Sequence, residues 1–114
     1  MIFVVDDDPR IRSLTADALR SAGHDVREFS GGRDALAALD DAANLRLIVS
    51  DVLMPGMDGP ALVRALLSRR PDVRVQYISG DVGETTAERL LPWPLLAKPF
   101  TAVALRQAVS AILA

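Results

Sequence analysis

Short apolar runs alternate with longer amphipathic stretches along the whole chain. Residues 2–5 form an apolar run that is too short for a helix, so we predict a strand there. Residues 45–50 are apolar enough for a buried central strand, and residues 73–78 predict a further one. Residues 25–29 alternate between apolar and polar side chains, as edge strands do, and residues 95–97 predict a short fifth strand.

Amphipathic segments between these strands predict helices. Residues 9–22 place apolar side chains at helical intervals, behind Asp8 as a candidate cap and Pro9 in the first turn. Residues 33–43 and 60–70 predict a second and a third helix, each with an apolar face.

The region before the fifth strand differs from the rest. Pro92 and Pro94 cannot continue a helix, so the fourth helix is expected to be shortened to about residues 84–91. Thr101 can cap a last helix that runs to the end of the sequence. Strands separated by helices imply right-handed crossovers and a parallel sheet covered on both faces. The pattern therefore predicts one α/β domain over residues 1–114, built as a three-layer sandwich.

Composition narrows the class of protein. The chain has 114 residues, of which 50% are hydrophobic and 25% charged, which fits one domain with a real core. The formal net charge is −2 and there is no run of Lys or Arg, which argues against a nucleic acid or an anionic membrane as a direct partner. There is no cysteine, and the sequence begins without the features of a signal peptide. We expect a cytoplasmic domain.

Carboxylates gather after two of the predicted strands. Asp6, Asp7 and Asp8 follow the first strand and Asp51 follows the third, so they should meet at one edge of the sheet. Two carboxylates about 4 Å apart repel by roughly 4 kcal/mol at an effective dielectric of about 20. A bound cation relieves this repulsion. Because the available ligands are oxygens, a hard ion such as Mg²⁺ is favoured over Zn²⁺.

Two further polar residues are expected at the same edge. Ser79 follows the fourth strand with a hydroxyl donor, and Lys98 follows the fifth with a compact positive charge. Both suit the oxygens of a phosphoryl group. Asp51 is then a candidate nucleophile, whose attack on a phosphoryl donor gives an acyl phosphate.

Four strings carry a family resemblance. They are VVDDDP at residues 4–9, SDVLMPGMDG at 50–59, ISG at 78–80 and KPF at 98–100, in this order and each at a predicted strand end. Together they resemble the receiver domains of two-component response regulators, including the chemotaxis regulator. The resemblance covers essentially the whole chain, and it implies a doubly wound, flavodoxin-like sheet with strand order 2-1-3-4-5.

The resemblance also implies a role for each matching residue. Asp51 would be the phosphoacceptor. Asp6 and Asp7 would hold Mg²⁺ together with Asp51 and the backbone carbonyl of Leu53. Ser79 and Lys98 would contact the phosphoryl group, and the peptide bond between Lys98 and Pro99 would be cis, an isomer that costs little before proline.

The implied partner is a histidine kinase or a histidine phosphotransfer protein. The domain would catalyse only its own phosphorylation and dephosphorylation, and it would signal by a change of its surface. It could stand alone or belong to a hybrid histidine kinase, and a homodimer is one option for its assembly. The family usually has an aromatic residue three positions before its lysine, whereas this chain has Leu95, so an aromatic switch is unavailable there.

Two other functions compete with this interpretation. An aspartyl-nucleophile, Mg²⁺-dependent phosphatase would need a second acid two residues after Asp51, where Leu53 stands, and a cap for which the chain is short. A pseudo-receiver would bind partners without being phosphorylated. The presence of Asp6, Asp7, Asp51 and Lys98 argues against it, and Leu95 keeps it open.

Overall fold

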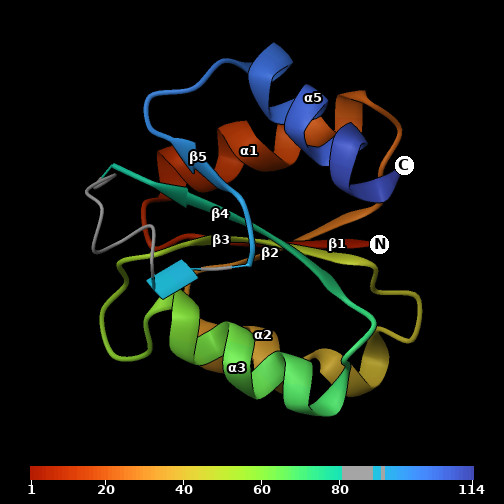
Figure 1. Ribbon diagram of the computed structural model, residues 1–114, viewed down its shortest axis with the longest axis vertical. Coiled ribbons are helices and arrows are strands. Elements are labelled where there is room, and N and C mark those ends of the chain that lie inside the picture. The colour runs from red at the N-terminus through yellow and green to blue at the C-terminus, as the bar shows by residue number, and fades with distance from the viewer. Residues whose placement is uncertain (81–88, 91) are drawn as a thin grey trace.

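The fold is a parallel sheet between two layers of helices (Figure 1). The computed structural model describes residues 1–80, 89–90 and 92–114. Among these residues the sheet has five strands, all parallel, in the order β2-β1-β3-β4-β5, which confirms the predicted order. The strands are β1 (Ile2–Val5), β2 (Val26–Phe29), β3 (Leu47–Asp51), β4 (Arg74–Ser79) and β5 (Leu95–Ala97).

Helices cover both faces of the sheet, as the sequence predicts. In Figure 1, α1 and α5 lie together on one side, and α2 and α3 on the other. The shortened fourth helix expected over residues 84–91 lies almost entirely outside the described residues. No helix in the described part of the chain is long and apolar enough to cross a membrane. The described helices are α1 (Pro9–Ser21), α2 (Gly32–Ala37), the 3-10 turn η1 (Leu39–Asp41), α3 (Gly59–Arg69) and α5 (Ala102–Leu113).

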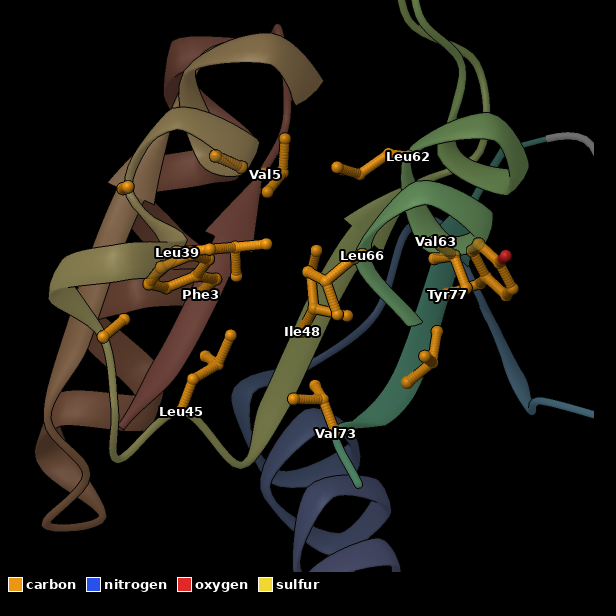
Figure 2. Close-up of a cluster of buried hydrophobic side chains, with 14 of the residues drawn as sticks. Phe3, Val5, Leu39, Leu45, Ile48, Leu62, Val63, Leu66, Val73 and Tyr77 are labelled. Atoms are coloured by element: carbon orange, nitrogen blue, oxygen red, sulfur yellow. The ribbon is translucent and has the colours of Figure 1, made fainter. Parts of the chain in front are cut away.

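Two apolar clusters hold these layers together, one on each face. Side chains of successive strand residues point to opposite faces, so Phe3 belongs to the cluster under α2 and α3, while Val4 belongs to the cluster under α1 and α5. Figure 2 shows the first cluster, in which Leu66 of α3 projects toward Ile48 of β3 and Leu62 of α3 projects toward Val5 of β1. Burial on both faces explains why the inner strand β1 is apolar throughout, whereas the edge strand β2 carries the polar residues Arg27 and Glu28.

The helix caps follow the sequence closely. The Asp8 carboxylate accepts a hydrogen bond of 2.9 Å from the backbone N–H of Arg10, and Pro9 stands in the first turn of α1. The Thr101 hydroxyl accepts one of 3.0 Å from the N–H of Ala104 at the start of α5. Both caps confirm the predicted helix starts.

The second helix differs from its prediction. A helix over residues 33–43 was expected, but α2 ends at Ala37 and a 3-10 turn follows. The N–H of Ala38 is shared between the carbonyls of Asp34 and Ala35, at 3.2 Å each, so the α-helical ladder tightens at this point. Asp40 and Asp41, which follow, are weak helix formers.

Candidate functional site

The carboxyl ends of four strands bring the predicted site residues to one edge of the sheet. Asp6 directly follows β1, and Lys98 directly follows β5. Asp51 and Ser79 were predicted to follow their strands directly, whereas in the structure they are the last residues of β3 and β4. The N–H of Lys98 donates to the carbonyl of Ser79 at 2.8 Å, which extends the ladder between β4 and β5 into the site. Parallel pairing thus places all four side chains at the predicted edge.

Three carboxylates form the acidic part of the site. One oxygen from each of Asp6, Asp7 and Asp51 lies within 4.8 Å of the other two. Asp6 is fully buried and Asp51 is only 7% exposed, whereas Asp7 is open to solvent. The cluster is therefore closed on the protein side and accessible from outside, as a metal site that also admits a phosphoryl group requires.

Lys98 is the cation of the site among the described residues. Its Nζ lies 3.2 Å from Asp6 Oδ2 and donates a hydrogen bond of 3.2 Å to Asp51 Oδ2. Burial alone would lower the pKa of Lys98, but the charges of Asp6 and Asp51 outweigh it and the net pKa is raised. The lysine is thus held fully charged between the two carboxylates. The peptide bond between Lys98 and Pro99 is cis, as the resemblance implies.

One oxygen of Asp6 remains without a hydrogen bond. Its Oδ1 accepts from the N–H of Asp8 at 2.9 Å, but the buried Oδ2 makes only the ion pair with Lys98. This buried oxygen relies on the charge of Lys98 alone, so it can accept a further cation as a ligand. The donor set consists of carboxylate oxygens, so the site fits a hard divalent ion such as Mg²⁺.

The charge of Asp51 is unfavourable in the native state. Burial and the negative charge of Asp6 raise the pKa of Asp51 above its ordinary value of 3.8, and Lys98 offsets part of this shift. The native state therefore binds a proton at Asp51 more tightly than the unfolded state does. The resulting stabilisation is complete below the unfolded pKa of 3.8 and is lost as the pH rises through the native pKa.

Asp51→Asn is therefore expected to stabilise the metal-free domain. The free energy of unfolding should rise by about 1 kcal/mol near pH 7, because the amide has no charge to desolvate. The gain should disappear as the pH falls below 3.8, because Asp51 then becomes protonated in the unfolded state as well as in the native state. Urea unfolding of the wild type and of Asp51→Asn, near pH 7 and at acidic pH, measures the difference. A gain in stability of the same size at neutral and at acidic pH would contradict this account.

Gly59 is a site residue that sequence reasoning missed. A Cβ on Gly59 would lie 2.3 Å from the carbonyl oxygen of Asp51 and 3.0 Å from Cα of Val52. The Gly59 N–H donates to the Val52 carbonyl at 2.8 Å. The start of α3 thus packs directly on the backbone that carries Asp51. The sequence pattern places Gly59 only at the end of a loop rich in Gly and Pro, although its position closing the SDVLMPGMDG string is a signal that could have found it.

Two further positions complete the comparison with the sequence. Leu53 lies in the loop between β3 and α3 and is 56% exposed, and the role of its carbonyl as a metal ligand stays a prediction. Leu95 of β5 lies opposite Tyr77 of β4 in the strand register. Tyr77 is buried, so an aromatic ring does lie beside the position that lacks one.

Comparison with known proteins is consistent with this geometry. The family model for the response regulator receiver domain matches residues 2–110. The chain belongs to this family. The solved structure of the chemotaxis protein CheY4 of Vibrio cholerae is similar, with a TM-score of 0.90 and 26% identity over 97% of this chain and 96% of that one. Both the receiver family and its flavodoxin-like fold are thus confirmed.

Relatives of this receiver domain include much longer proteins. The sensor kinase CckA of Brucella abortus is 34% identical over 104 residues, which are 88% of this chain and 11% of that protein. The C4-dicarboxylate transport transcriptional regulatory protein DctD of Rhizobium meliloti is 35% identical over 104 residues, which are 89% of this chain and 22% of that protein. The chain therefore spans less than a quarter of each of these relatives.

Proposed function

We propose that this receiver accepts a phosphoryl group onto Asp51, in a Mg²⁺-dependent reaction, from the phosphohistidine of a histidine kinase or phosphotransfer protein. The observation that carries the proposal is the pairing of Asp51 Oδ2 with Lys98 inside an acidic cluster that has an unbonded Asp6 oxygen. The cluster supplies a nucleophile, a fixed cation and ligands for a second cation. These are the parts that phosphoryl transfer requires.

The residues divide the chemistry as follows. An oxygen of Asp51 attacks phosphorus, and the bond to the histidine nitrogen breaks as the imidazole leaves with its electron pair. Lys98 stabilises charge on the transferring oxygens and is already within 3.2 Å of Asp51 Oδ2. Asp6, Asp7 and Asp51 would hold Mg²⁺, which when bound neutralises charge on the phosphoryl oxygens.

Phosphorylation would also change the balance of charge at the site. The phosphoryl group carries about −1.5 to −2 charges and replaces the single charge of the Asp51 carboxylate, so the site gains up to about one negative charge. We propose that Lys98 and the Ser79 hydroxyl then move toward the phosphoryl group, and that this shifts the adjacent surface for signalling. Ser79 is buried at the end of β4 and pairs with Ala97, the residue before Lys98, so both groups can respond to the same oxygens.

The surface next to the site suits a protein donor. Leu14 of α1 is 66% exposed, and it lines an apolar hollow together with Phe100 and with Lys98, which is shared with the site. An apolar surface continuous with the phosphoacceptor is where a histidine-bearing helix would rest while its phosphohistidine reaches Asp51. This favours a protein over a small molecule as the physiological donor.

The competing functions fit less well. An aspartyl-nucleophile phosphatase needs a second acid two residues after its nucleophile, and this chain has the exposed Leu53 at that position. A pseudo-receiver would have no need for the pairing between Lys98, Asp6 and Asp51, which is intact.

Acetyl phosphate provides the direct test. Incubation with acetyl phosphate and Mg²⁺ is expected to add one phosphoryl group to the wild-type domain, measured by intact mass, and to shift amide resonances around Ser79 and Lys98. Omission of Mg²⁺ and the variant Asp51→Asn should each abolish the addition. If Mg²⁺ binds but neither acetyl phosphate nor a phosphorylated histidine phosphotransfer protein modifies Asp51, the pseudo-receiver is the better description.

A further inference from the structure

A guanidinium group outside the proposed chemistry contacts the turn that carries the acidic residues. Arg12 lies in the second turn of α1 with its side chain 22% exposed. Its Nη1 donates a hydrogen bond of 2.9 Å to the backbone carbonyl of Asp6. This contact reaches from the helix back to the end of β1, and it closes the loop formed by residues 6–12.

The contact fixes Asp6 together with two others. The N–H of Asp6 donates to the carbonyl of Phe29 at 3.2 Å, and its Oδ1 accepts from the N–H of Asp8 at 2.9 Å. With the carbonyl held by Arg12, every polar atom of Asp6 except Oδ2 has a hydrogen-bond partner. The backbone and the carboxylate therefore cannot rotate without breaking a bond, and Oδ2 is left as the atom directed at the cation site.

A carboxylate on the neighbouring strand holds Arg12 in this orientation. Nε of Arg12 lies 3.9 Å from Oε1 of Glu28, on β2. Glu28 also accepts a hydrogen bond of 2.9 Å from Nη1 of Arg20, which lies about two turns further along the same face of α1. Guanidinium groups pair preferentially with carboxylates. Without Glu28, Arg12 would have the site carboxylates as its alternative partners and would compete there with a metal ion.

We infer that Arg12 is a positioning residue for the metal-binding turn, and that Glu28 keeps its guanidinium on the Asp6 carbonyl and away from the carboxylates. The inference rests on the proposed function, because it assumes that Asp6 Oδ2 binds Mg²⁺. It assigns Arg12 an effect on metal affinity through the backbone of a ligand rather than through direct contact with the ion, as outer-shell groups of other metal sites act.

Arg20 provides a matched control for the test. It lies on the same helix, contacts the same Glu28 and also donates to the Val26 carbonyl at 2.9 Å, and in the described part of the structure its hydrogen bonds end there rather than at Asp6. The variants Arg12→Gln, Glu28→Gln and Arg20→Gln are compared with wild type by calorimetric titration with MgCl₂ and by urea unfolding. A purely structural role would lower the stability of all three and leave their Mg²⁺ affinities alike.

We expect Arg12→Gln to weaken Mg²⁺ binding by about tenfold and Glu28→Gln to weaken it in the same direction. Arg20→Gln should bind within about twofold of wild type. Equal affinities for Arg12→Gln and Arg20→Gln would overturn the inference. If Arg12→Gln does not fold, an unchanged affinity in Glu28→Gln overturns it instead. Failure of the wild-type domain itself to bind Mg²⁺ would be a different result, because it would contradict the proposed function.

Discussion

Lys98→Met is expected to slow the phosphorylation of Asp51 by about 100- to 1000-fold, because the variant removes the fixed positive charge that faces the transferring oxygens. In the native state that charge lies 3.2 Å from both Asp6 Oδ2 and Asp51 Oδ2. The methionine side chain has a similar length, so the change in packing is small. The rate is measured by intact mass with acetyl phosphate at saturating Mg²⁺.

The same variant should have opposite effects on stability and on metal binding. Without Lys98, two buried carboxylates face each other, so the metal-free domain should lose about 2 kcal/mol, less than for a fully buried pair because Lys98 is 20% exposed. Mg²⁺ should then bind more tightly, because it becomes the only cation between Asp6 and Asp51. Lys98→Arg keeps the charge and serves as the control. A Lys98→Met domain phosphorylated at the wild-type rate would contradict the role of the lysine.

Gly59→Ala is expected to damage both the fold and the site. The new Cβ would lie 2.3 Å from the Asp51 carbonyl oxygen, which no real contact allows, so α3 or the end of β3 must move. We expect a loss of about 3 kcal/mol in the free energy of unfolding. Because a displacement of about 1 Å in a reacting group can cost about 100-fold in rate, phosphorylation of the folded fraction should slow as well.

Gly31→Ala is the matched control for this substitution. Gly31 has an extended backbone, and a Cβ there would meet nothing within 4 Å. Gly31 is the N-cap of α2, where alanine is less favourable than glycine, so this variant should lose only up to about 1 kcal/mol by urea unfolding. If the two alanine variants were equally stable, the close packing of Gly59 on Asp51 would not be a constraint on the fold.

The gathering of the site residues could be predicted because it depends on topology alone. Asp6, Asp51 and Lys98 each stand at the end of a predicted strand, and in a parallel sheet all such ends share one edge. The caps Asp8 and Thr101 could be predicted because a cap acts on backbone only a few residues away.

Other features depend on how elements are placed in space, and periodicity does not contain this information. Gly59 has the composition of a loop residue, and only the approach of α3 to β3 shows why a side chain cannot stand there. Arg12 has the pattern of an ordinary polar helix residue until its bond to the Asp6 carbonyl is seen. Tyr77 lies opposite Leu95 because of the register between β4 and β5, which the sequence of either strand does not give.

Both ends of the chain lie at the edge of the sheet remote from Asp51. The terminal amine of Met1 donates to the carbonyl of Asn44, before β3 begins, and Ala114 lies beside Arg46 and Arg74 at the starts of β3 and β4 (Figure 1). A tag, a linker to a surface or a fused reporter at either terminus would therefore extend from the end of the domain opposite to Asp51. Immobilised receivers prepared in this way should keep the phosphoacceptor facing the solution, which makes the domain suitable for capturing its donor on a solid support.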